Sequence, residues 1–224
     1  MQFSLPSFLL TILFGGLFLV ASFIHYKNKY KIAYSVRNMF PYELNYKSHF
    51  ADNFYGNTAL ILTILGFAFF FSTFDLNFHN GFFIVTLISG VLASLFFLIL
   101  VFVPLDYIRI HSIIFVFFLI FSFLLPSSVC VGSFVYNQYL MSIGESTPIP
   151  LIVFGLSFLM TIVTLALLLN PKLTLNLRMK KVVNEDGTIK YVRPNVLTLA
   201  FTEWILFFLL YINELLIFIL TFVF

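Results

Sequence analysis

The stretch TLAFTEWILFFLLYINELLIFILTFVF, residues 198–224, is almost entirely apolar and carries only two charged side chains, Glu203 and Glu214. About 20 predominantly apolar residues are enough for a helix to cross the roughly 30 Å hydrocarbon core of a bilayer. The rest of the chain has the same character, because 61% of its 224 residues are hydrophobic, only 9% are charged and the mean hydropathy is +1.06. Soluble proteins carry about 25% charged residues. The sequence therefore predicts an integral membrane protein.

Five further stretches are long and apolar enough to cross a bilayer. Together with the last one, they predict six transmembrane helices at about residues 6–24, 58–74, 81–103, 112–136, 149–169 and 198–224. Lipid covers the apolar surface of such a chain. The length of the chain therefore predicts how many helices cross the membrane better than it predicts the number of domains. We therefore expect residues 1–224 to form a single all-α membrane domain, a bundle of six transmembrane helices.

The positive charges of the chain are confined to alternate connections between these helices. Five follow the first predicted helix, one follows the third and six follow the fifth, which accounts for all twelve Lys and Arg residues. Basic residues are retained on the cytoplasmic side of a membrane, or on the matrix side in an organelle. The asymmetry predicts that both termini lie on the outer side and that segments 25–57 and 170–197 lie on the inner side. The membrane would be a bacterial cytoplasmic membrane or a mitochondrial inner membrane.

The two long inner segments carry different structural signals. In the first, Tyr30, Tyr34 and Phe40 recur near helical spacing, which predicts a short amphipathic helix in the plane of the interface, ended by Pro41. In the second, the turn-forming sequence Asn-Glu-Asp-Gly at residues 184–187 lies between two loosely alternating runs. That pattern predicts a small β-hairpin on the inner side of the membrane.

A stripe of small residues runs along one of the predicted helices. Thr86, Gly90 and Ser94 follow one another at intervals of four residues. Small residues at this spacing share one helix face and let another backbone approach closely. We interpret the stripe as a packing surface.

The two acids of the last helix are the first candidates for a functional site. Glu203 and Glu214 are eleven residues apart, which brings them to nearly the same helix face, separated by about 16 Å along the axis. We expect Glu203, one turn from the inner end, to reach toward the headgroups or the basic residues of the hairpin. Glu214 is expected near the middle of the membrane.

A carboxylate at that depth costs several kcal/mol unless it is paired. No Lys or Arg lies in the interior of any predicted helix. We therefore expect Glu214 to be protonated and hydrogen-bonded, hydrated in a cavity, or bonded to another subunit. Tyr211 and Asn213 are its nearest candidate donors along the chain, although adjacent residues point to different faces of a helix. A buried hydrogen bond between helices and a proton or cation path through Glu214 and Glu203 both remain open.

A second group of polar residues lies in the inner turn between the third and fourth helices. Asp106, Arg109 and His111 could bind an anionic headgroup or a quinone carbonyl, or could form a salt bridge that stabilises the turn. His25 and His111 lie near the inner ends of their helices, so bis-imidazole ligation of a b-type haem is an alternative. We predict no other metal or cofactor, because the single Cys130 excludes any site built from several thiolates.

Catalytic motifs are lacking. The sequence contains no His-Glu-x-x-His metal site, no Gly-x-Ser-x-Gly nucleophile elbow and no phosphate-binding glycine-rich loop. The few basic residues lie too close to the predicted membrane for nucleic-acid binding. The sequence therefore does not indicate an enzyme.

Three functions remain, in this order. The first is a non-catalytic subunit of a larger membrane complex, energy-converting or translocating, which binds other membrane subunits. The second is a small transporter or channel that uses Glu214 and Glu203. The third is an intramembrane lipid-modifying enzyme. A Glu214 that faces outward from the bundle would favour the first function, whereas an internal, hydrated Glu214 would favour the second.

Overall fold

Six membrane-length helices dominate the computed structural model, which describes residues 4–31, 33–45, 50–74, 81–103, 107–145, 147–171, 173, 180–183, 189–192 and 194–221. The helices are α1 (Ser4–Tyr30), α2 (Phe54–Thr73), α3 (Gly81–Phe102), α4 (Ile108–Ser142), α5 (Ile149–Leu168) and α6 (Thr198–Leu220). Within the described ranges these six helices are long and apolar enough to cross a membrane, which confirms the predicted number of spans. The chain is an integral membrane protein.

The helix α4 is longer than the sequence predicts. It has 35 residues, or about 52 Å, whereas the apolar run that predicted it covers only residues 112–136. The helix continues past the apolar run to Ser142, and Gly144, just beyond the C-cap Ile143, has a φ of +81°, the left-handed conformation that commonly ends helices. Hydropathy marks where a chain leaves the lipid, while helix-ending residues mark where the backbone stops coiling.

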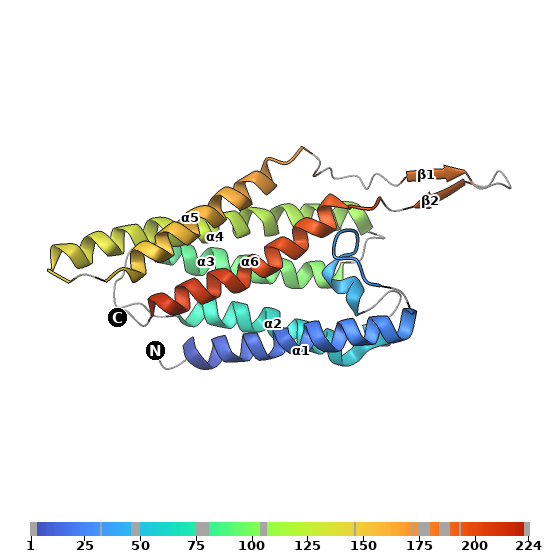
Figure 1. Cartoon of the computed structure of the whole chain (residues 1–224), viewed down its shortest axis with the longest axis horizontal. Coiled ribbons are helices and arrows are strands. Elements are labelled where there is room, and N and C mark those ends of the chain that lie inside the picture. Colours follow the sequence, from blue (N-terminus) through green and yellow to red (C-terminus); the bar gives the residue numbers. More distant parts are fainter. Residues whose placement is uncertain are drawn as a thin grey trace.

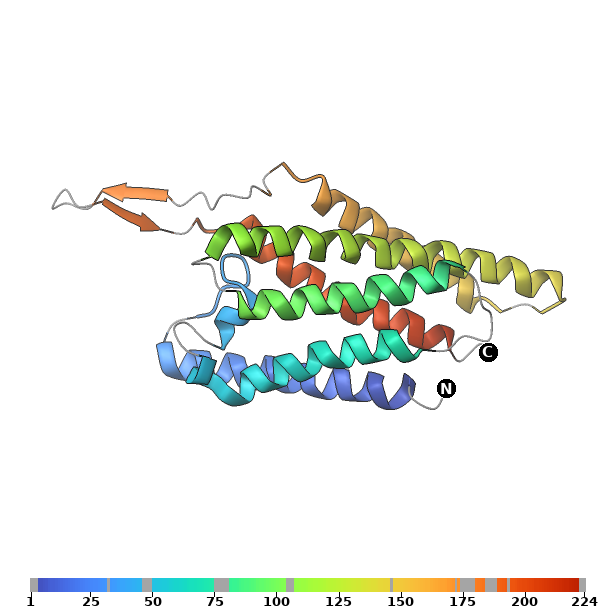
Figure 2. The same ribbon diagram turned by 180° about the vertical axis from the view of Figure 1, so that it is seen from behind.

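The helix α6 occupies the centre of the fold. Helices α1 to α5 pack side by side in chain order, and α6 packs across this row against α1, α2, α4 and α5 (Figures 1 and 2). It is the most buried of the six spans. A polar residue on nearly any face of α6 is therefore placed inside the protein rather than against lipid.

The predicted interfacial helix after α1 is wrong. The helix α1 continues to Tyr30, and residues 33–40 form turns and extended backbone. Pro41 begins the short 3₁₀ helix η1 (Pro41–Leu44) instead of ending a helix, and a second one, η2 (Phe50–Asn53), precedes α2. The aromatic residues that suggested an amphipathic helix pack inward, because Phe40 is fully buried. We call residues 33–45 the elbow.

Two short strands form the only described connection that extends away from the helices. The strands β1 (Lys180–Val183) and β2 (Ile189–Val192) pair antiparallel, with Lys180 opposite Val192. They lie beyond one end of the bundle, whereas the start of α1 and the finish of α6 lie at the other end (Figure 1). The turn predicted at residues 184–187 lies outside the described residues. The inner position of the hairpin and the outer position of the termini remain predictions.

The small-residue stripe of α3 packs against both neighbouring helices. The Thr86 hydroxyl is 2.8 Å from that of Ser128 in α4, and Gly90 lies directly against the ring of Phe71 in α2. A Cβ at Gly90 would overlap this ring, which is buried and cannot easily move.

We expect Gly90→Ala to lower the free energy of unfolding by about 1–3 kcal/mol, because it inserts a methyl group into a filled interface. The control is Gly155→Ala in α5, where an added Cβ meets no atom within 4 Å. Thermal unfolding in detergent micelles measures both. Equal melting temperatures for the two variants would contradict the predicted overlap.

Candidate functional site

Both acids of α6 lie inside the bundle. The exposed fraction of Glu203 is 1% and that of Glu214 is 0%. Phe207 and Leu210, which lie between them on the same face, are buried as well. The two acids share a helix face, as their spacing predicts. Glu203 does not reach toward headgroups or the hairpin as expected, because it is buried inside the bundle.

Glu203 instead pairs with a histidine from α4. Its Oε1 lies 2.8 Å from His111 Nε2, and His111 Nδ1 lies 2.7 Å from the carbonyl oxygen of Val103. Because a carbonyl only accepts, Nδ1 carries a hydrogen and donates it to Val103. His111 Nε2 and Glu203 therefore share a second proton, either as imidazolium and carboxylate or as neutral imidazole and carboxylic acid. The pair holds one exchangeable proton and has no net charge in either form.

The elbow covers this pair with a third acid. Glu43 in η1 is buried, and its Oε2 accepts a 2.8 Å hydrogen bond from the Phe40 amide. The rings of Phe40 and Tyr42 contact the His111 imidazole, with centroids 5.1 and 6.1 Å away. Glu43 is close enough to act electrostatically on both His111 and Glu203. Sequence reasoning missed Glu43, although it is the only acid between Tyr26 and Ala51.

Trp204, next to Glu203, fixes the elbow to α6. Its Nε1 donates toward the Met39 carbonyl at 3.0 Å and the Tyr34 hydroxyl at 3.1 Å. The Tyr34 hydroxyl in turn donates to the Phe40 carbonyl at 2.6 Å. Burial raises the pKa of Tyr34 well above its ordinary value, so the hydroxyl stays protonated and remains a donor. These contacts hold the elbow over the pair, and the single tryptophan of the chain was the overlooked signal for them.

Glu214 has a different environment. Neither of its carboxyl oxygens has a hydrogen-bond partner among the residues that the structure describes. Thr11 of α1 is close enough to interact with it, but the Thr11 hydroxyl donates to the Ser7 carbonyl at 2.9 Å. Glu214 is thus a buried acid with unused hydrogen-bonding capacity.

The two donors predicted for Glu214 point elsewhere. The Asn213 amide donates to the Leu209 carbonyl at 2.8 Å. The Tyr211 hydroxyl lies against Gly15 of α1, close to Thr63 of α2, and has no hydrogen-bond partner in the described part of the chain. Buried polar atoms without a hydrogen-bond partner are uncommon. Three neighbouring residues of α6 carry such atoms in the described structure: Tyr211, Asn213 and Glu214.

Two of the three residues predicted to bind a headgroup or quinone lie in the described part of the chain. Arg109 is exposed while His111 points into the bundle, and Asp106 lies outside the described residues. For the haem alternative, iron ligation by His111 would break one of the two hydrogen bonds that its ring forms. Nε2 of His25 has no hydrogen-bond partner in the described structure. Among the described residues, no three His, Cys, Asp or Glu side chains converge as a metal site.

No family model matches this chain. No curated protein and no solved structure matches it either. Its function therefore has to be inferred from the geometry of α6 and its neighbours. That geometry offers one proton-sharing pair at the end of the bundle and one isolated carboxyl about 16 Å away along the same helix face.

Proposed function

We propose that the chain forms a proton path through the membrane. Glu214 is the proton carrier at mid-depth, and the pair of His111 and Glu203 exchanges protons at one end of the bundle. The observation that supports this proposal is the complete burial of Glu214 within the bundle, with neither oxygen bonded to a described residue. An ionisable residue at such depth is expensive and is usually associated with transport of protons or ions.

The arrangement implies a closed path. A separation of about 16 Å along the helix exceeds the reach of a direct hydrogen bond, so a chain of water molecules or a movement of α6 must connect the two sites. Phe207 and Leu210 fill the space between the acids and are buried. In the proposed cycle these two side chains are the barrier, and displacing them admits water.

The inward position of Glu214 supports a proton path better than it supports the function that the sequence placed first. A glutamate that recruits another subunit has to face the outside of the bundle, where a partner helix can supply a donor. Glu214 faces α1 and the interior instead. Glu214 therefore gives no support to a role as a complex subunit.

Proton flux into liposomes tests the proposal. With the purified chain reconstituted around a trapped pH-sensitive dye, an imposed pH gradient and a potassium–valinomycin clamp, we expect dissipation well above that of empty liposomes. Glu214→Gln should abolish this flux, because an amide cannot accept and release a proton, whereas Glu214→Asp should retain part of it. The control Glu145→Gln makes the same change at an exposed acid and should leave the flux unchanged. No flux in the parent, or equal flux in Glu214→Gln, would refute the proposal.

A second function, that of a subunit in a larger complex, is favoured by the hairpin. The strands β1 and β2 pair with each other and extend away from the helices (Figure 1). A two-stranded hairpin is at best marginally stable alone in water. We propose that a protein partner stabilises it.

Purification of the tagged chain under mild conditions tests the second function. We expect a stoichiometric partner to co-purify with the parent and to be lost when residues 180–192 are replaced by a Gly-Ser linker. Migration of the parent as a lone chain would argue against a subunit role. The proton path does not depend on this result.

A further inference from the structure

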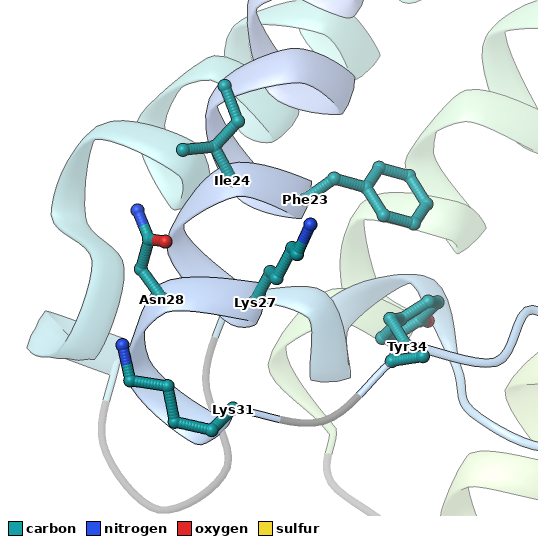
Figure 3. Close-up of a pocket in the computed structure, with 7 residues that line it drawn as sticks. Phe23, Ile24, Lys27, Asn28, Lys31 and Tyr34 are labelled. Atoms are coloured by element: carbon teal, nitrogen blue, oxygen red, sulfur yellow. The ribbon is translucent and has the colours of Figure 1, made fainter.

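A cavity of about 630 Å³ lies where α1 ends and the chain turns back into the elbow. Figure 3 shows the residues of α1 on one side and Tyr34 on the other. The lining residues are Phe23, Ile24, Lys27, Asn28, Lys31, Ala33 and Tyr34. The cavity is at the end of the bundle to which the hairpin also extends, opposite the start of α1 (Figure 1).

The backbone at Lys31 creates the second wall of the cavity. Its φ of +55° is the only left-handed conformation of a non-glycine residue in the described chain. This conformation is unfavourable for a residue with a side chain, and such strain is often found at functional sites. The turn brings Ala33 and Tyr34 back alongside α1. Because Tyr34 is held by Trp204 and by the Phe40 carbonyl, this wall is fixed in place.

The cavity combines an apolar surface with two lysines that form no ion pair with a described acid. Lys27 and Lys31 both line the cavity, Lys27 beside Phe23 and Lys31 on the side of Asn28 (Figure 3), and neither forms an ion pair with a described residue. Lys29, between them in sequence, points elsewhere and pairs with Asp52 at 2.9 Å. Phe23 and Ile24 provide exposed apolar side chains on the preceding turn, toward the membrane-spanning part of α1.

We infer that this cavity binds one anionic phospholipid. Its phosphate lies between the ammonium groups of Lys27 and Lys31, with the Asn28 amide as an additional donor. One acyl chain follows Phe23 and Ile24 along α1 toward the middle of the membrane. Basic pockets at helix ends recognise such headgroups because the lysine charge complements the phosphate, while the hydrocarbon contacts restrict the ligand to a lipid. This binding site is independent of the proposed proton path.

Lipid titration of the purified full chain tests the site. In neutral detergent, native mass spectrometry and thermal unfolding should show one tightly bound phosphatidylglycerol and a raised melting temperature, with no comparable effect of phosphatidylcholine. The double substitution Lys27→Gln with Lys31→Gln should weaken phosphatidylglycerol binding by about tenfold or more. Lys29→Gln is the matched control, because it removes the same charge from the same helix turn but from outside the cavity.

Two further measurements separate this site from simpler explanations. Inorganic phosphate and glycerol phosphate at the same concentrations should not stabilise the chain, since they lack the acyl contacts. Lys31→Gly should raise the melting temperature by relieving the backbone strain and yet weaken lipid binding, a combination that a purely structural lysine would not produce. Equal binding of phosphatidylcholine, equal loss in Lys29→Gln, or full stabilisation by free phosphate would overturn the inference. Glu214→Gln should bind phosphatidylglycerol like the parent whatever its proton flux.

Discussion

Replacing Glu203 by leucine is expected to lower the free energy of unfolding by about 3 kcal/mol. The change removes the partner of His111 Nε2 in a site that is closed to solvent, where Glu203 and His111 are 1% and 0% exposed. Removing one member of a buried, hydrogen-bonded pair leaves the other without a partner, which costs several kcal/mol. His111→Leu should cost a similar amount, because it strands the Glu203 carboxyl in the same way.

The double variant with both leucines should be less destabilised than the sum of the single variants, with a coupling energy of about 2 kcal/mol. When leucine replaces both residues, the carboxyl and the imidazole are both gone, so neither one is left buried without its partner. Unfolding in mixed detergent micelles measures all four proteins of the cycle. Additive effects would show that the contact between Glu203 and His111 contributes nothing of its own.

Trp204→Ala is expected to cost about 3 kcal/mol and to release the elbow. Trp204 is 1% exposed and donates to the elbow at Met39 and Tyr34, while its ring packs on Phe18. Truncating a buried tryptophan leaves a cavity and removes these contacts. Trp204→Phe keeps most of the ring volume, so its smaller cost, about 1 kcal/mol, reports mainly the lost hydrogen bonds.

Thermal unfolding and limited trypsin digestion together measure this effect. We expect faster cleavage after Arg37, an exposed elbow residue, in Trp204→Ala than in the parent. Phe208→Ala is the control, because Phe208 stacks on Trp204 but is 43% exposed and contacts lipid in the proposed membrane orientation. An Arg37 bond that is cleaved at the parental rate in Trp204→Ala would contradict the role given to this tryptophan.

The predictions that succeeded depended on local patterns. The six spans follow from runs of apolar residues, and the shared face of Glu203 and Glu214 follows from the helical repeat. The stripe of Thr86, Gly90 and Ser94 likewise needed only a spacing of four residues to be interpreted as a packing surface.

The predictions that failed concern contacts between distant segments. Glu203 and His111 are 92 residues apart in sequence, and nothing in either neighbourhood indicates the other. Part of the elbow was predicted to be an amphipathic helix because Tyr30, Ala33, Tyr34 and Phe40 recur near helical spacing. Those aromatic side chains instead fill space beside Trp204 and His111, and the packing overrides the periodicity.

By itself, the sequence determined that this chain lies in a membrane, how many membrane-length helices it has, and which helix carries the two acids on one face. These properties depend on hydropathy and on the fixed rise of a helix, both of which are local. Only the tertiary structure decided that α6 is the central helix, that Glu203 shares a proton with His111 and that Glu214 faces inward without a described partner. In a membrane, lipid and protein interior are equally apolar, so hydropathy cannot distinguish the two faces of a helix; that choice is made by how six helices pack together.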